Sequence, residues 1–302
     1  ALLAALRPGC RLVLVGDPDQ LPSVGAGNVF SDLIRSGRVA TVALRDIFRQ
    51  AGQSMIVRNA HLVNTGMPPQ LKNAAANDFF FLPRRDSVRL VETVVELCKT
   101  RLPDKMGIPA EELQVLTPTR RGDAGTRSLN FALQAALNPP KPGKQERRFG
   151  ELTFREGDRV MQTRNDYDVV WQKEDGTAGT GIFNGDVGKI AKIDPSGELL
   201  EIVFDDRTAT YTSDMLAELD MAYAMTVHKA QGSEYRGVVF IGAPCAPSLM
   251  VRGVLYTAIT RARELLVIVG DDSAVNKMAE NDRRSRRYSG LKWRLRKGGE
   301  EK

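Results

Sequence analysis

Polar residues suited to contacting phosphate follow several short apolar runs of the sequence. Gln20 stands in a Gly-Asp-Pro loop after the run at 11–15, and Arg49 stands just beyond a second run at 41–44. A glutamine amide can hydrogen-bond a phosphate oxygen and a water molecule at once. An arginine guanidinium can make a bidentate contact with a phosphate. A plain βα turn and an exposed arginine explain the same residues, so each motif alone leaves both interpretations open.

A third polar segment, TVHKAQGSEY, covers residues 226–235. It follows a strand-like stretch and gathers small hydrogen-bond donors before Gly232. Such donors can bind phosphate or sugar without reading bases. The alternative is a polar connection in which His228 is an ordinary loop residue.

A fourth segment, YTAITRAR, covers residues 256–263 and carries Arg261 and Arg263. On a helix these two side chains would point about 200° apart, so at most one could face a given site. An arginine directed at a γ-phosphate can contribute roughly 10³–10⁵ in rate.

The pattern around these motifs predicts alternating strands and helices. Strands are expected, in chain order, at 11–15, 41–44, 113–117, 222–226, 237–242 and 265–270. Helices are expected at about 27–35, 55–65, 128–138 and 252–263, and Ser54 and Asp86 are expected N-caps. Ligands bind at the carboxyl ends of strands in open α/β sheets. The sequence therefore predicts an α/β fold with a parallel sheet whose strand ends carry polar motifs.

The character of the sequence changes after a Pro- and Lys-rich stretch near residue 139. Short alternating segments follow, and Asn184-Gly185 is a strong hairpin signal. Residues 148–213 are therefore expected to form a small antiparallel barrel inserted in the α/β unit. Residues 168–181, which hold three glycines, are expected to form a long, mobile loop.

Composition excludes several classes of protein. The 302 residues are 42% hydrophobic and 26% charged, which is typical of a globular protein. No apolar run reaches the ~18 residues of a membrane span. The three cysteines lie far apart and there are two histidines, so a disulfide framework or a metal centre is not expected. A cytoplasmic setting fits this pattern best.

The positive charge is concentrated at the end of the chain. Residues 283–302 hold nine basic and two acidic residues, so the net charge of +6 leaves the rest of the chain near −1. Tyr288 and Trp293 stand among these arginines, a composition that suits nucleic-acid backbone and base stacking. A solvated, frayed end explains the same tail.

Taken in order, these motifs resemble those of a known family. GDPDQLPSV, FRQ, TVHKAQGSEY and YTAITRAR are similar to the later motifs of superfamily 1 helicases of the RecD-like (RecD/TraA) type, over about residues 1–272. The resemblance implies RecA-like, P-loop-type parallel-sheet domains with the inserted β-barrel. It implies five segments: 1–40, the end of the first RecA-like domain; 41–147 and 214–272, the second; 148–213, the barrel; and 273–302, the basic tail.

The resemblance also assigns roles to residues. Gln20 would sense the γ-phosphate of ATP, and Arg49 and Arg261 would reach it from across the cleft. Gly232 and Glu234 would lie between nucleotide and DNA. The expected DNA-binding residues are Pro22, Ser23, Thr117, Asn165, Tyr167, Thr226, His228 and Ser233.

One expected motif is absent from the sequence. No G-x-x-x-x-G-K-[ST] loop occurs, and this loop would cradle phosphates and supply a Mg²⁺ ligand. In this family it lies upstream of the GDPDQ loop. The chain, which begins at Ala1, is therefore expected to be a fragment that does not hydrolyse ATP alone, whereas the full-length protein would use ATP and Mg²⁺.

The resulting expectation is the C-terminal motor half of a 5′→3′ ATP-dependent DNA helicase in recombination and repair, such as a RecD-type subunit of exodeoxyribonuclease V. Expected partners are single-stranded DNA and RecBC-like subunits or a single-stranded-DNA-binding protein, with no membrane. The alternatives are a non-catalytic DNA-binding or partner module and the helicase half of a conjugative relaxase.

Overall fold

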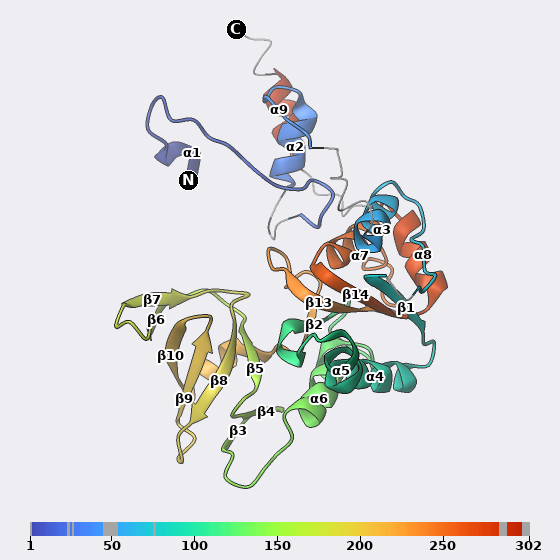
Figure 1. Ribbon diagram of the computed structural model, residues 1–302. Coiled ribbons are helices and arrows are strands. Elements are labelled where there is room, and N and C mark those ends of the chain that lie inside the picture. Colours follow the sequence, from blue (N-terminus) through green and yellow to red (C-terminus); the bar gives the residue numbers. More distant parts are fainter. Residues whose placement is uncertain are drawn as a thin grey trace.

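A computed structural model describes residues 2–22, 25, 27–44, 54–74, 77–283 and 289–297. Two sheets dominate it (Figure 1): a parallel sheet with helices around it, and an antiparallel sheet beside it. The described helices include none long and apolar enough to span a bilayer.

The parallel sheet has five strands in the order β1-β14-β13-β2-β12. Their bounds are β1 (Phe79–Pro83), β2 (Leu113–Thr117), β12 (Ala224–Thr226), β13 (Tyr235–Gly242) and β14 (Ala262–Gly270). All neighbouring pairs run parallel. This confirms the α/β fold class and the strands expected at 113–117, 222–226, 237–242 and 265–270.

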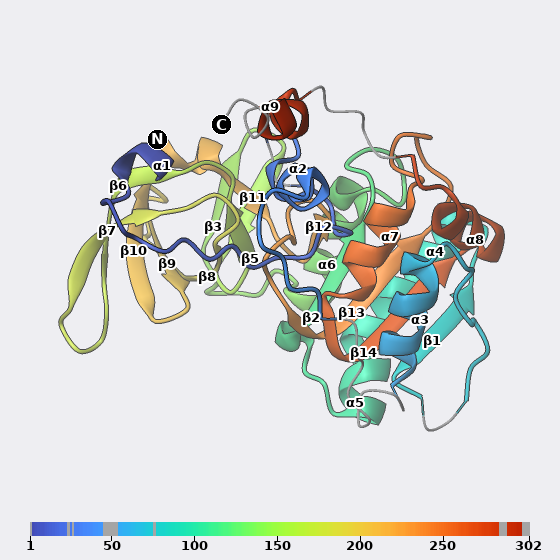
Figure 2. The same ribbon diagram turned by 90° about the horizontal axis from the view of Figure 1, so that it is seen from above.

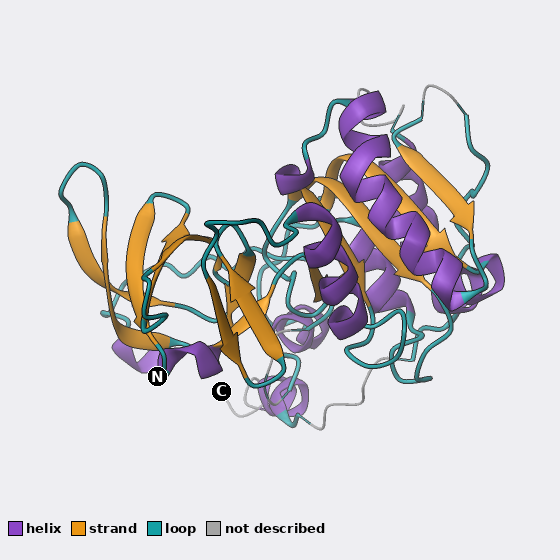
Figure 3. Cartoon of the chain, turned by 90° about the horizontal axis from the view of Figure 1, so that it is seen from below, coloured by secondary structure: helices purple, strands orange, loops and turns teal. Residues whose placement is uncertain are grey.

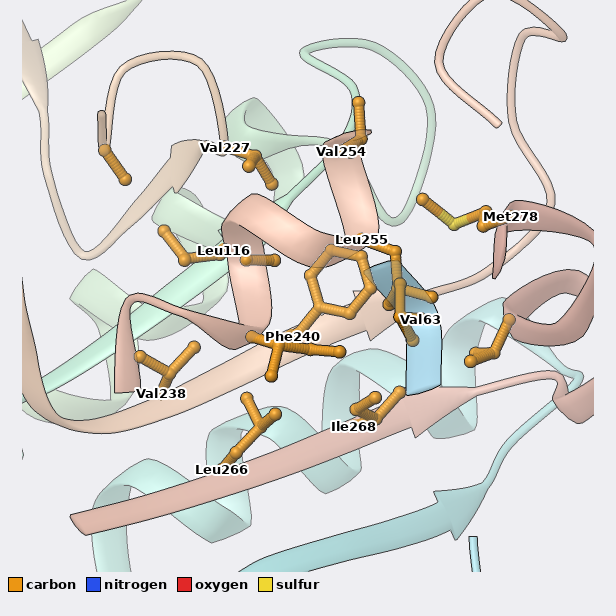
Figure 4. Packing of buried hydrophobic residues seen from close by; sticks show 14 of the residues in the cluster. Val63, Leu116, Val227, Val238, Phe240, Val254, Leu255, Leu266, Ile268 and Met278 are labelled. Carbon is orange, nitrogen blue, oxygen red and sulfur yellow. The ribbon is translucent and has the colours of Figure 1, made fainter. Parts of the chain in front are cut away.

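Helices cover both faces of this sheet (Figure 3). The first face carries α3 (Met55–Asn64), α7 (Arg252–Ile259) and α8 (Asp272–Glu280). The second carries α4 (Ser87–Glu96), η2 (Leu97–Arg101), α5 (Leu102–Met106) and α6 (Thr126–Leu137), and η3 (Ala110–Glu112) precedes β2. Because side chains alternate along a strand, Phe240 of β13 packs on the first face and Ile241 on the second. Figure 4 shows Phe240 among Val63, Leu255 and Ile268.

Both expected N-caps are confirmed. The Ser54 hydroxyl accepts the Val57 N–H, and the Asp86 carboxylate accepts the Arg89 N–H. Val88, Val91, Val95 and Cys98 recur at helical spacing in the sequence. In α4, however, Val88 is exposed and Leu90 packs in the core instead.

The second sheet is antiparallel, with the order β11-β5-β8-β9-β10-β6-β7. Its strands are β5 (Arg159–Gln162), β6 (Asp166–Gln172), β7 (Ala178–Ile182), β8 (Val187–Ile193), β9 (Leu199–Phe204), β10 (Arg207–Thr212) and β11 (Leu219–Met221). A hairpin of β3 (Glu146–Phe149) and β4 (Leu152–Arg155) precedes it, and η4 (Met215–Glu218) connects β10 to β11. Its core is a separate hydrophobic cluster that includes Phe154, Phe204 and Tyr211.

The expected loop at 168–181 is wrong. Residues 166–182 form the paired strands β6 and β7, joined by a short turn in which the Lys173 N–H donates to the Thr177 carbonyl. Val169 is buried in the core of the sheet, so an apolar contact outweighs the glycines of this segment.

Two strand predictions near the start are also wrong. Residues 11–15 and 41–44 have no regular structure, and Val15 and Leu44 are more than 90% exposed. An apolar run forms a strand only beside a partner strand, and no described segment pairs with either run. The helix expected at 27–35 is confirmed as α2 (Val29–Ser36), and a short α1 (Leu2–Ala5) precedes it.

The helix expected at 252–263 ends earlier, at Ile259, because the chain turns there into β14. Arg261 therefore lies in the turn and Arg263 on the strand, so the expected helical separation of the two arginines does not apply.

Residues 273–280, expected as the start of the basic tail, belong instead to α8, and Val275 and Met278 of this helix are buried in the core. Further along the chain lies α9 (Leu291–Lys297), which packs on α2 (Figures 1 and 2). The Arg296 guanidinium donates to the carbonyls of Arg35 and Ser36, and Arg38 donates to the Arg296 carbonyl. Neither expectation for the tail, a nucleic-acid arm or a frayed end, included this contact.

Candidate functional site

The loop at 16–22 lies against α7, more than 230 residues further along the chain. The Tyr256 hydroxyl donates to Asp17 Oδ2 at 2.9 Å, and the Leu21 N–H donates to Thr257 Oγ1 at 3.0 Å. Burial, followed by the charge of Asp17, raises the pKa of Tyr256 and keeps this hydroxyl a donor. These bonds bring the GDPDQ and YTAITRAR motifs together.

Gln20 connects the two motifs through both ends of its amide. Its Nε2 donates to Asp17 Oδ2 at 3.2 Å, and its Oε1 accepts from Arg261 Nη2 at 3.0 Å. A displacement of Arg261 would therefore be transmitted to the loop.

Arg261 is only 5% exposed, and oxygen atoms of neutral groups surround it. Besides Gln20, it donates to the Ser233 carbonyl at 2.8 Å, to the Thr257 carbonyl at 3.2 Å and to the Thr260 hydroxyl at 3.2 Å. Within the described ranges no carboxylate lies within ion-pair distance of it. A buried cation without an anion is costly, so this position suits an anionic ligand.

The segment at 226–235 contacts the same cluster. The Gln231 side chain donates to the Leu21 carbonyl, and Ser233 supplies the carbonyl that Arg261 binds. Gly232 has a φ of +85°, and a Cβ there would meet no atom within 4 Å. The turn thus has open space at Gly232, and Glu234 is exposed.

The structure brings together Gln20, Arg261, Ser233 and the Gly232 turn from the sequence-derived site. Pro22 is partly buried at the end of the same loop. Ser23 and Arg49 lie outside the described residues.

The expected DNA-binding residues differ in accessibility. Thr117 is completely buried and its hydroxyl donates to the Ala124 carbonyl, so it stabilises the turn after β2 and has no free surface. Thr226 is partly buried at the end of β12, and His228 is exposed. Asn165 and Tyr167 are exposed at the start of β6, in the antiparallel sheet.

Hydrogen bonds connect the segment at 226–235 to the antiparallel sheet. Lys229 Nζ donates to Asn184 Oδ1 at 2.5 Å, and the Asn184 N–H donates to Asn165 Oδ1 at 3.0 Å. The segment at 226–235 is therefore tied both to the loop at 16–22 and to the antiparallel sheet.

Sequence reasoning missed the roles of Asp17, Thr257, Tyr256, Lys229 and Asn184. Each stands inside a motif or a turn that the sequence singled out. Their partners are far apart in sequence, and spacing alone carries no signal of such contacts.

Known families match the same parts of the chain. Residues 129–204 match the SH3 domain of ATP-dependent RecD-like DNA helicases, 221–269 a UvrD-like helicase C-terminal domain, and 1–82 an AAA domain. These matches confirm the resemblance of the chain to RecD-like superfamily 1 helicases.

Several individual proteins are also similar to the chain. The chain is 36% identical to the ATP-dependent RecD2 DNA helicase of Deinococcus radiodurans over 95% of its length, and 32% identical to the RecBCD enzyme subunit RecD of Mycolicibacterium smegmatis over 99%. It spans 36% and 51% of these two relatives. A probable conjugal transfer protein TraA of Sinorhizobium fredii is 26% identical over 86% of the chain and is covered over 22% of its own length. Among solved structures, a Bacteroides Pif1 helicase with ADP-AlF3 and single-stranded DNA aligns over 87% of the chain and 62% of its own, at 18% identity and a TM-score of 0.46.

Proposed function

We propose that this chain is the C-terminal motor half of an ATP-dependent DNA helicase that acts in recombination and repair and moves 5′→3′. The observation that carries the proposal is Arg261, a buried guanidinium that has no carboxylate partner among the described residues and is bonded to Gln20 of a distant loop. The similarity to RecD2 and RecD proteins over nearly the whole chain supports it.

The residues present fit part of an ATP site. Arg261 and Gln20 would face the γ-phosphate, with Arg49 as a second arginine, and the open turn at Gly232 would lie beside them with Glu234. ATP would supply the phosphoanhydride bond whose hydrolysis drives movement. The sequence contains no phosphate-cradling loop, so we assign no Mg²⁺ ligand in this chain and expect no turnover by it alone.

Hydrogen bonds within the chain suggest how a structural change at Arg261 would reach the segment at 226–235. A change at Arg261 would reach the loop at 16–22 through Gln20, and the loop would reach the segment at 226–235 through the bond between Gln231 and Leu21. That segment, with Thr226, His228 and Ser233, is our candidate for the grip on single-stranded DNA, together with Pro22 and Ser23. RecBC-like subunits and a single-stranded-DNA-binding protein are proposed partners, and the cytoplasm is the proposed location.

The helicase half of a conjugative relaxase is a second candidate, favoured by the match to TraA. The sequence upstream of residue 1 in the gene would separate the two.

ATP hydrolysis with and without single-stranded DNA tests the proposal. It would be measured on this chain and on a version that carries the upstream sequence of its gene. DNA-stimulated turnover by the longer version only is the expected result. A silent longer version would contradict the motor and favour a non-catalytic DNA-binding module.

A further inference from the structure

A groove of about 650 Å³ lies on the outer face of the antiparallel sheet, over β6, β9 and β10. Because side chains alternate along a strand, Val169, Ile202 and Ala209 fill the core while their neighbours point away from it. Acidic and apolar side chains line the groove together. They include Asp166, Asp168, Val170, Trp171, Glu201 and Met215, and we call this surface the acidic groove.

The acidic groove lies where β6 and β10 separate. Their ladder consists of two residue pairs and stops at Ala209, although β10 continues to Thr212 and stays paired with β9 there. A strand directs backbone N–H and C=O groups to both of its sides. The end of β10 therefore has such groups on the groove side, where no described strand pairs with it. At the far end, Met215 Sδ accepts the Thr212 N–H.

The carboxylates of the acidic groove are not neutralised. Among the described residues that line it none is basic, and Asp166, Asp168 and Glu201 have no ion-pair partner in the described ranges. Arg207 of β10 is paired with Asp186 at 3.2 Å instead. The groove therefore carries a concentrated negative charge.

This charge and its distribution limit what the groove can bind. Nucleic-acid phosphates would be repelled. Within the described ranges no three metal-ligating side chains converge on one point, so the carboxylates are spread along the groove and do not form a site for one ion. Several cations carried side by side on one chain fit such a surface better.

The apolar part of the acidic groove suits lysine and arginine. These side chains pack their aliphatic stems on apolar surface and keep the charged end free. Val170 is 64% exposed beside the carboxylates and offers such a surface. Trp171 lines the groove as well, and its Nε1 is a buried donor that has no acceptor among the described residues. A backbone carbonyl of a bound segment is the kind of acceptor that this donor lacks.

We propose that the acidic groove binds an extended segment of a partner protein that carries lysine or arginine at alternate positions. Alternate side chains of an extended chain lie on one face, so they would reach Asp168 and Glu201 together. The backbone of the segment would pair with the free side of β10, as in other cases of peptide recognition by strand addition. Charge complementarity would select this partner over acidic ones. The inference goes beyond the ATP site and concerns which protein the chain binds.

Binding of labelled peptides to the 302-residue chain tests the groove. Fluorescence anisotropy would compare a short peptide in which lysine alternates with threonine and the same peptide with glutamate in place of lysine. The chain should bind the lysine peptide, more weakly as salt increases, and should not bind the glutamate peptide. Asp168→Asn combined with Glu201→Gln removes two charges and keeps the shape. This variant should bind about 2- to 30-fold more weakly, the effect of two exposed ion pairs.

A matched control separates the groove from general charge. Glu174→Gln combined with Glu198→Gln removes two charges from exposed turns of the same sheet, outside the groove, and should bind like the wild type. Equal affinity of the wild type and the groove variant would overturn the proposal, because the peptide would then bind elsewhere. Equal losses in the groove variant and the control would overturn it as well, since net charge would then explain the binding.

A third variant blocks the groove. Thr210 lies opposite Glu201 in the register of β9 and β10, so the guanidinium of Thr210→Arg can pair with that carboxylate and occupy the groove. Binding of the lysine peptide should be weaker than in the variant that only removes charges. Unchanged binding in Thr210→Arg, no binding of the lysine peptide by the wild type, or equal binding of both peptides would overturn the proposal. None of these results depends on ATP turnover, so the helicase proposal is tested separately.

Discussion

At the scale of single residues, the site depends on residues that each form hydrogen bonds with two different partners. The Gln20 amide accepts from Arg261 and donates to Asp17, so replacing either neighbour leaves part of Gln20 unpaired. Thr257 acts similarly, because it is completely buried, its hydroxyl accepts the Leu21 N–H and its carbonyl accepts from Arg261. The loop at 16–22 is therefore held by hydrogen bonds to α7.

Thr257→Val tests this attachment. Valine has the shape of threonine but accepts no hydrogen bond, so the loop should open more readily. Amide hydrogen exchange at 17–22 should become roughly 2- to 10-fold faster, the effect of one hydrogen bond. Thr210→Val, at an exposed position of β10, is the control and should leave the loop unchanged. Equal exchange in both variants would contradict the attachment.

Burial distinguishes two of the three thiols. It raises the pKa of Cys98 to about 12, whereas Cys10 is exposed. Because the thiolate is the reactive form, Cys98 should stay unreactive toward a disulfide reagent between pH 7 and 9 in the folded chain. Cys10 should react, because it is exposed. Fast labelling of Cys98 without denaturant would show that this core is open.

At the scale of elements, one buried carboxylate joins the two sheets. Asp158 is completely buried in the turn between β4 and β5 and accepts from Gln134 and Asn138 of the α6 region at 2.6 and 2.7 Å. It also accepts from the Arg155 N–H at 2.7 Å and from the Tyr223 hydroxyl, just before β12, at 2.9 Å. These bonds fix the start of the antiparallel sheet against the α/β part.

Asp158→Ala would leave several buried donors unpaired. Each such group costs about 1–3 kcal/mol, so the free energy of unfolding should fall by at least about 3 kcal/mol. Urea denaturation measures this, with the exposed Asp168→Ala as the control expected to stay within about 0.5 kcal/mol. A small change in Asp158→Ala would mean that the contact between the sheets is held by other groups.

Elements were predicted well where local sequence decides them. Ser54 and Asp86 cap their helices as expected, since capping involves residues three apart. The runs at 11–15 and 41–44 were predicted as strands because they are apolar, but a strand also needs a neighbour, which sequence spacing does not reveal. The hairpin at 166–182 was missed because its glycines outweighed the pattern around Val169. For the site, the motifs singled out Gln20 and Arg261, which the structure places in one hydrogen bond, and their roles stay a prediction. The bond from Lys229 to Asn184 depends on how two sheets meet, which the motifs do not reveal.

At the scale of the whole molecule, two helices more than 250 residues apart in the sequence pack on each other. The basic helix α9 packs on α2, and Arg296 binds the last carbonyls of that helix, where a cation is favourable. One basic side chain of the tail, Arg296, therefore has a structural role near residues 29–38.

Arg296→Ala tests this contact. Loss of the guanidinium should make amide exchange in 29–38 about 2- to 10-fold faster and leave the parallel sheet unchanged. Arg294→Ala removes the same charge from an exposed residue of α9 and should have little effect. If amide exchange in 29–38 becomes equally fast in both variants, this region is stabilised by the total positive charge of α9 and not by the contact of Arg296.

The most direct test of the motor concerns Arg261. In a version of the protein that carries its upstream sequence and turns over ATP, Arg261→Ala would be compared with Arg263→Ala, an exposed arginine on β14. The account predicts that Arg261→Ala lowers DNA-stimulated ATP turnover by about 10³-fold or more while the affinity for single-stranded DNA is largely kept, and that Arg263→Ala changes neither by much. Equal loss of turnover and DNA affinity in Arg261→Ala, or normal turnover, would contradict the role of Arg261 at the γ-phosphate.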